Sequence, residues 1–202
     1  MHIDFKKLSA AQTYFTLIQT VIPRPIAWVL TENESKDYNV APFSYFTAVS
    51  SDPALLMFSI GKKKDSDMKD TLRNIRDRNQ FVIHIADINL ADQVNQSAKA
   101  LPYGESELNA IGLETTMIDN FPIPRISKAK VAFACSLYDI KEIGNTPMSM
   151  VFAEIEHAVI NDEIITENDN RYMIESEKLN PLSRLGGNDY AELAKPFTLS
   201  RP

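Results

Sequence analysis

The feature that most constrains the fold of this sequence is a pair of long alternating stretches in its last third. Residues 131–143 read VAFACSLYDIKEI and residues 148–160 read MSMVFAEIEHAVI, and both alternate apolar with other side chains over much of their length. Alternation with a period of two is typical of a strand that buries one face. The tetrapeptide Gly144-Asn145-Thr146-Pro147 between them is composed of turn-forming residues. The sequence therefore predicts a long antiparallel hairpin, which favours an antiparallel fold over a parallel βαβ one.

Shorter strand-like runs precede this hairpin. Residues 26–30, 45–50, 55–60 and 81–86 are rich in apolar and β-branched side chains, and prolines mark several of the joints between them. Helical spacing predicts helices over 8–20, 68–78 and 90–100, with Asp67 as the N-cap of the second. About seven strands with helices inserted between strand groups predict a mainly β protein, built as a closed or half-closed barrel.

Composition narrows the class of protein. A chain of 202 residues fits one domain, expected to span residues 1–202 with a C-terminal extension. The net charge of −6 and a pI near 5.1 argue against nucleic-acid binding. Cys135 is the single cysteine, so no intramolecular disulfide can form, and the three histidines are too scattered to predict a metal site. No apolar run approaches the ~20 residues that span a membrane, and the N-terminus lacks a signal-peptide pattern, so we expect a cytoplasmic protein.

One stretch places small hydroxyl side chains beside aromatic rings in an irregular strand. Such a surface suits a flat ligand with a polar rim, because ring faces supply apolar contact while hydroxyl and backbone N–H groups orient the ligand. The candidate binding residues of this stretch are Ala41, Pro42, Phe43, Ser44, Tyr45, Phe46, Thr47, Ser50 and Ser51.

Two further segments carry charged candidates. The run GKKKDSD at 61–67 leads towards Lys69, Asp70 and Thr71, and a basic loop that enters a helix can bind a phosphate. The alternative for this run is a solvated charged loop. Near the C-terminus, Arg184 and Tyr190 flank paired glycines and could meet an anion and a ring, or belong to a turn that docks onto the body.

Several pieces of this chain together resemble the flavin reductase-like family of FMN-binding split-barrel proteins, which includes the flavoredoxins. The matching pieces occur in the family's order and span nearly the whole chain: Pro23-Arg24-Pro25-Ile26-Ala27, Asn39-Val40-Ala41-Pro42-Phe43-Ser44-Tyr45-Phe46, Ser50-Ser51-Asp52-Pro53, Lys69-Asp70-Thr71 with Asn74-Ile75, Phe81-Val82-Ile83-His84, Tyr103-Gly104-Glu105-Ser106-Glu107-Leu108 with Gly112-Leu113, and Leu182-Ser183-Arg184-Leu185-Gly186-Gly187 with Tyr190.

The resemblance implies a six-stranded Greek-key split barrel that forms a homodimer and binds FMN noncovalently at the subunit edge. It implies that residues 41–51 line the isoalloxazine and ribityl chain, and that Lys64 and the Lys69-Asp70-Thr71 turn lie near the phosphate. Arg24 lies at a matching motif position, and the segment from Arg184 to Tyr190 would lie near the flavin or the partner subunit. No side chain need act as acid or base, because the redox chemistry belongs to the flavin.

Three functions remain open at this point. The first is an FMN-dependent oxidoreductase that reduces flavin with NAD(P)H or relays electrons to a redox partner protein. The second is an FMN carrier or electron-transfer module without NAD(P)H turnover of its own. The third is a split barrel that has lost flavin and serves a structural or haem-binding role, which the retained hydroxyls and lysines disfavour. The sequence shows no recognisable NAD(P)H motif.

Overall fold

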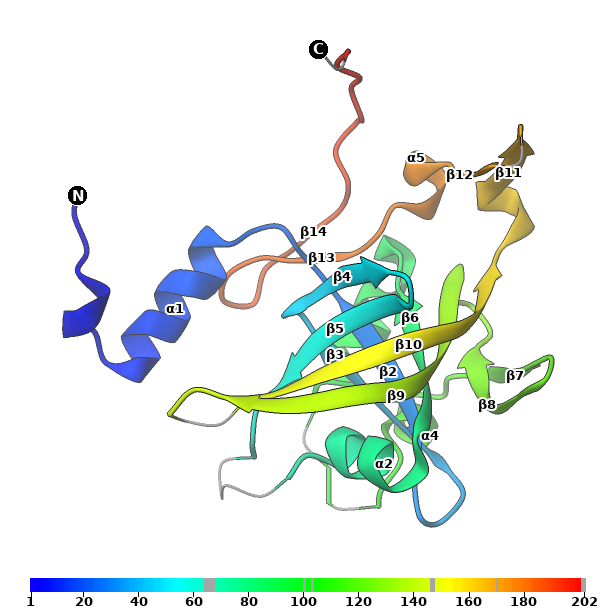
Figure 1. The fold of residues 1–202 in the computed structure, drawn as a ribbon, viewed down its shortest axis with the longest axis horizontal. Helices are drawn as coiled ribbons and strands as arrows, with labels where there is room; N and C mark the ends of the chain where they lie inside the picture. The colour runs from blue at the N-terminus through cyan, green and yellow to red at the C-terminus, as the bar shows by residue number, and fades with distance from the viewer. Residues whose placement is uncertain (64–67, 100, 103, 146–147, 170, 201–202) are drawn as a thin grey trace.

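The computed structural model describes residues 1–63, 68–99, 101–102, 104–145, 148–169 and 171–200. Its centre is an antiparallel sheet of seven strands (Figure 1). In spatial order these are β3 (Tyr38–Phe43), β2 (Ala27–Glu32), β6 (Gln80–Ile85), β9 (Val131–Ile143), β10 (Met148–Ile160), β5 (Ala54–Ile60) and β4 (Phe46–Ser51). The prediction of a mainly β, antiparallel fold is therefore confirmed, with seven strands in the main sheet where the resemblance implied six.

The sheet curls into a barrel because its two end strands are consecutive in the chain. Only Ser44 and Tyr45 separate the end of β3 from the start of β4. Past this link, the backbone N–H of Ser59 in β5 donates to the Tyr45 carbonyl at 2.9 Å. The rings of Phe43 and Phe58 then meet inside, with centroids 5.4 Å apart. A two-residue connection between opposite ends of a sheet can be made only if the sheet closes on itself.

The predicted hairpin is the longest structure in the fold. Its strands β9 and β10 have the predicted bounds, and Ile143 pairs with Met148 across the turn. The register shifts between Phe152 and Ala153 and again between Ile155 and His157. These irregularities are bulges, which bend and twist a strand and help a sheet close into a barrel.

Strand β2 separates two apolar cores. Ala27 and Val29 point into the barrel with Phe58 and Phe81, whereas Trp28 and its alternate neighbours face the second core outside. The outer core is covered by α3 (Ala91–Gln96), α4 (Glu107–Ala110) and the hairpin of β7 (Thr115–Ile118) and β8 (Phe121–Ile126). A strand buried on both faces reads as a continuous apolar run, which explains the composition of residues 26–30.

All three predicted helices are present, and each begins one or two residues later than predicted. Helix α1 (Ala10–Thr20) is capped by Ser9, whose hydroxyl accepts from Gln12 N–H in a capping box. Helix α2 (Asp70–Arg78) begins two residues later than predicted, with Lys69 at the N-cap position and no side-chain cap. Asp67, the predicted N-cap, lies outside the described residues. The predicted helix over 90–100 is reduced to α3, preceded by a 3-10 turn at Ile88–Leu90.

Small elements complete the described chain. A three-stranded sheet joins β1 (Arg24–Pro25) to β13 (Ser183–Arg184) and β14 (Tyr190–Ala191), which brings the C-terminal segment back to the start of the barrel. A separate hairpin pairs β11 (Ile165–Asn168) with β12 (Arg171–Ile174), followed by α5 (Ser176–Leu179). Short 3-10 turns lie at Phe5–Lys7 and Asp162–Ile164. Among the described residues, no helix is long and apolar enough to cross a membrane.

Candidate functional site

Two cavities lie on either side of the link between β3 and β4. The polar cavity, of about 160 Å³, includes the end of β3 and the start of α2. Its lining residues are Asn39, Ala41, Pro42, Phe43, Lys63, Lys69, Asp70, Thr71, Ser97, Ala98, Lys99, Leu101 and Glu107. The apolar cavity, of about 450 Å³, is lined by Leu17, Val21, Pro23, Arg24, Pro25, Ser44, Tyr45, Phe46, Met57, Ser59, Ile143 and Met150. The predicted stretch is thus divided: residues 41–43 face the polar cavity and 44–46 the apolar one.

The polar cavity concentrates positive charge at the N-terminus of α2. Lys63 and Asp70 form an ion pair at 2.9 Å, which leaves Lys69 and Lys99 as further cations of the lining. Burial lowers the pKa of Lys69, and the nearby charge of Lys63 lowers it further. The Lys69 Nζ lies 5.6 Å from the centroid of the Phe43 ring, where the ring face favours a cation. Since the first N–H groups of a helix lack intrahelical acceptors, this arrangement is suited to an anion.

A buried hydrogen-bond network holds Thr71 at this cavity. The Asn39 Nδ2 donates to Thr71 Oγ1 at 3.0 Å, so the hydroxyl accepts from Asn39 and keeps its own proton to donate elsewhere. Asn39 also contacts Thr31 Oγ1 at 3.4 Å, and Asn74 Nδ2 donates to that oxygen at 3.0 Å. The Thr71 side chain is only 1% exposed, so the network fixes it in place.

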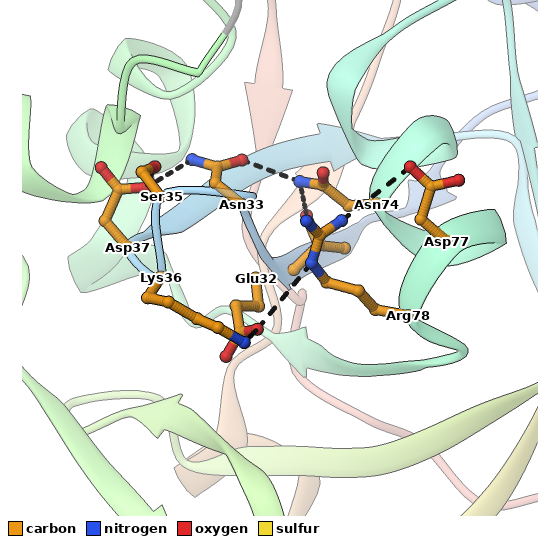
Figure 2. Close-up of polar contacts among 9 residues, drawn as sticks. Glu32, Asn33, Ser35, Lys36, Asp37, Asn74, Asp77 and Arg78 are labelled. Carbon is orange, nitrogen blue, oxygen red and sulfur yellow. Dashed lines mark hydrogen bonds and ion pairs between the residues drawn. The ribbon is translucent and has the colours of Figure 1, made fainter.

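The same network continues away from the cavity to the turn between β2 and β3. Figure 2 shows Asn74 reaching from α2 to Asn33, whose Oδ1 accepts from Asn74 Nδ2 at 2.8 Å. Asn33 in turn donates to Asp37 Oδ1 at 2.8 Å, and the neighbouring Arg78 lies 3.8 Å from Glu32. The polar turn is therefore anchored to α2, and α2 is anchored to the strand that lines the cavity.

Sequence reasoning did not single out Glu107, which is the most perturbed acid of the cavity. Burial raises its pKa to about 7, the negative charge of Asp70 adds to the rise, and backbone N–H groups of Glu107 and Val40 oppose it. The side chain is 7% exposed, and its Oε2 has no hydrogen-bond partner among the described residues. In the sequence, Glu107 is visible only as one of two glutamates in the motif from Tyr103 to Leu108, and no neighbouring residue marks it as part of a binding site.

Arg24 lines the apolar cavity, but its guanidinium is held by the protein itself. It donates to the carbonyls of Ile18 and Val21 at the end of α1 and to Leu185 in the C-terminal segment. Its Nε also lies 3.4 Å from Ser44 Oγ. Arg24 is thus a buried clamp that joins α1, the β3–β4 link and the C-terminal segment.

Other predicted binding residues lie outside both cavities. Thr47, Ser50 and Ser51 belong to β4, an exposed edge strand of the main sheet. Arg184 stacks on Tyr190 with its guanidinium carbon 4.5 Å from the ring centroid, and Tyr190 donates to Asn95 at 3.2 Å. The paired glycines lie in a turn closed by the bond from Leu185 N–H to the Asp189 carbonyl, and flavin contact by Arg184 and Tyr190 stays a prediction. Lys64 lies outside the described residues.

The remaining candidates for chemistry are structural. His84 is fully buried: its Nδ1 lies 3.0 Å from the Trp28 carbonyl, and its Nε2 accepts from the Ile126 N–H at 2.9 Å. Cys135 is buried, and burial raises the pKa of its thiol well above the usual range. Within the described ranges, no cluster of histidine, cysteine and acidic side chains has metal-binding geometry.

The structure is thus a curled antiparallel β-barrel with a small, lysine-lined polar cavity beside α2. The family model for the flavin reductase like domain matches residues 19–175, and the chain belongs to that family. It is similar to the uncharacterized protein YwrF of Bacillus subtilis, with 37% identity over 97% of this chain and 96% of the relative.

Two solved structures share the fold over nearly their whole length. One is the 2-nitrobenzoate 2-nitroreductase NbaA of Pseudomonas fluorescens, 33% identical with a TM-score of 0.89 over 100% of this chain and 96% of that chain. The other is the nitrilotriacetate monooxygenase component B of Bacillus cereus, 28% identical with a TM-score of 0.90 over 98% of each chain. The split-barrel fold that the resemblance implied is thereby confirmed.

Proposed function

We propose that this protein is an FMN-dependent oxidoreductase of the flavin reductase type. The observation that carries the proposal is the pairing of a cationic, phosphate-sized cavity with an apolar cavity across the β3–β4 link, in a chain of the flavin reductase like family. Two similar structures, a nitroreductase and a monooxygenase component, are by name redox proteins, and this supports the same class.

In this proposal the polar cavity takes the phosphate of FMN. At about 160 Å³ it is smaller than the roughly 300 Å³ at which pockets for whole ligands begin, but it can hold one charged group. Lys69 and Lys99 supply positive charge, and Thr71 supplies a hydroxyl proton. Residues 42–46, which line the two cavities, would hold the isoalloxazine ring.

When bound, the flavin supplies hydride and electron transfer, and the chain supplies position and electrostatics. The network through Asn39 and Asn74 holds the phosphate end, and Arg24 holds the link between β3 and β4. NAD(P)H is the proposed reductant, and the apolar cavity would be the place where its nicotinamide reaches the flavin.

The purified protein, titrated with FMN, tests this function. We expect the flavin absorbance and fluorescence to change on binding, and NADH or NADPH to be oxidised when FMN is present. Binding without oxidation of either nicotinamide would favour an FMN carrier or electron-transfer module. A protein that is colourless after incubation with excess FMN and removal of the unbound FMN would contradict the proposal.

Thr71→Ala is expected to weaken FMN binding about tenfold, because a hydrogen bond to a charged group contributes roughly 1.5 kcal/mol. Fluorescence titration measures the dissociation constant, and urea unfolding followed through Trp28 measures stability. Thr16→Ala in the exposed helix α1 is the matched control, since its hydroxyl bonds only to the Gln12 carbonyl. Equal FMN affinity in Thr71→Ala and Thr16→Ala would show that the phosphate binds elsewhere. A loss of about tenfold is likewise expected for Lys64→Ala.

A homodimer is expected because α1, which contributes Leu17 to the apolar cavity, and the C-terminal segment both expose large apolar side chains. Phe15 and Val21 of the α1 region are 56% and 59% exposed, and Phe197 and Leu199 of the C-terminal segment are 84% and 78% exposed. Figure 1 shows α1 and this segment extending from the barrel. Sedimentation velocity at micromolar concentration is expected to give a dimer that Phe15→Glu weakens, whereas a monomeric wild-type protein would contradict this expectation.

A further inference from the structure

We propose that Glu107 is a ligand-binding residue of the polar cavity, which meets a phosphate ester as a neutral acid and donates a hydrogen bond from its carboxyl group to a phosphate oxygen. The bound anion is thereby accompanied by one proton, which resides on the Glu107 carboxyl. This inference rests on the proposed function in that it takes the occupant of the cavity to be a phosphate monoester.

Glu107 is held at the polar cavity by the contacts of α4 with β3. The first residue of α4 is fixed against β3, because the Ser106 hydroxyl donates to the Tyr38 carbonyl and accepts from Asn109 N–H. Glu107 lines the polar cavity at 7% exposure, and its Oε2 has no partner among the described residues. Because a buried polar atom without a partner costs roughly 1–3 kcal/mol, this oxygen is expected to meet a group that enters the cavity.

The charges around the cavity decide which protonation state can meet an anion. Asp70 at the start of α2 and Lys63 after β5 form an ion pair, and Lys69 and Lys99 face the same space. An ionised Glu107 would add a second carboxylate to this lining and repel the phosphate. A neutral carboxyl group removes that repulsion and offers a proton that a phosphate oxygen can accept.

The acidity of Glu107 fits this role. Its pKa is raised to about 7, chiefly by burial and also by the charge of Asp70, against the lowering effect of the backbone N–H groups of Glu107 and Val40 and of the charge of Lys63. The free protein thus holds both forms near neutral pH. A phosphate dianion beside the carboxyl would raise this pKa again, so that binding takes up a fraction of a proton at pH 7 and weakens as the pH rises.

The test measures FMN affinity between about pH 7 and pH 8.5, a window above the phosphate pKa near 6, so that the ligand itself stays a dianion. In the wild-type protein we expect the dissociation constant to rise about tenfold over this window. Glu107→Gln keeps the shape and donates from its amide in place of the acid, so its affinity is expected to stay nearly constant. Calorimetry in two buffers of different ionisation enthalpy should show proton uptake at pH 7 in the wild type and nearly none in Glu107→Gln.

Glu105→Gln is the matched control, because Glu105 is exposed, lies two residues away and does not line the cavity. It should keep the wild-type pH profile. Any loss of FMN affinity with rising pH that remains in Glu107→Gln comes from deprotonation of the lysines, above all Lys69, whose pKa is lowered. Riboflavin, which lacks the phosphate, should show no steep profile. A wild-type profile in Glu107→Gln, or the same profile with riboflavin, would overturn the proposal.

Inorganic phosphate separates the failure of this inference from the failure of the flavin proposal. If FMN does not bind, the proposed function fails, and phosphate alone then decides the role of Glu107. The inference is supported if phosphate raises the Tm of the wild-type protein near pH 7 but not near pH 8.5. In Glu107→Gln, phosphate should raise the Tm at both pH values. No effect of phosphate on Tm at either pH would overturn the inference.

Discussion

Lowering the pH from 6.5 towards 4 is expected to remove roughly 3 kcal/mol of folding stability through His84, once Glu107 is replaced by glutamine. Burial lowers the pKa of His84 to about 4, the hydrogen bond to the Trp28 carbonyl opposes this, and Arg125 adds to the lowering. The unfolded chain therefore binds the proton first. The stability is present in full above pH 6.5 and is lost as the pH falls towards 4.

The glutamine background is needed because Glu107 acts in the opposite direction. Its folded pKa of about 7 lies above the ordinary 4.5, so its contribution is present below pH 4.5 and is lost as the pH rises towards 7. In the wild-type protein the two effects overlap between pH 4.5 and 6.5 and partly cancel. Glu107→Gln removes one of them.

Urea unfolding at several pH values, followed through the single tryptophan, measures the effect of His84. Trp28 is a suitable probe because it is fully buried and its ring lies 6.1 Å from the His84 ring. His157→Gln is the control, since His157 is exposed and its loss should leave the acid limb unchanged. An NMR titration that finds His84 protonating near pH 6.5 in the folded protein would contradict the prediction.

Arg24→Ala is expected to destabilise the protein by about 3 kcal/mol, because buried hydrogen bonds from a charged group are lost together. The guanidinium holds the carbonyls of Ile18, Val21 and Leu185, at the end of α1 and in the C-terminal segment. The arginine is only 6% exposed, so water cannot readily replace it. We expect faster hydrogen exchange in residues 10–20 and 183–191 in addition to the lower unfolding free energy.

Arg184→Ala is the matched control for Arg24→Ala, because the two residues are directly paired across β1 and β13. The Arg184 guanidinium bonds only within its own turn, to the carbonyls of Gly187 and Asp189, and stacks on Tyr190. Its loss is expected to cost less than about 1 kcal/mol. Equal costs for the two variants would show that Arg24 does not act as a clamp.

Strands were predictable where burial on one or both faces left a repeating signal. The hairpin of β9 and β10 has its predicted bounds, and the apolar runs of β2, β5 and β6 are strands within one or two residues. β8 was missed because Pro122 and Pro124 interrupt it; prolines are tolerated there because β8 pairs only with β7. β12 was missed because its residues are exposed and carry no alternation.

The candidate site was predictable in part, for a related reason. Lys69, Asp70 and Thr71 are adjacent in the sequence, so their meeting at a helix entry could be expected, and the structure places them at the polar cavity. The hydrogen bond from Asn39 to Thr71 joins residues 32 apart. Glu107 comes from a third segment, and no local pattern shows that α4 places it beside Asp70.

The sequence by itself determined that this chain forms an antiparallel β structure, because side chains alternate wherever a strand has one buried face, and its motifs indicated the family. Only the tertiary structure decided which charges meet. The closure of the barrel through Ser44 and Tyr45 divides the predicted binding stretch between two cavities. Helices α2 and α4 both contact β3, where burial changes the acidity of Glu107, and burial is a property of the folded chain that residue order alone does not give.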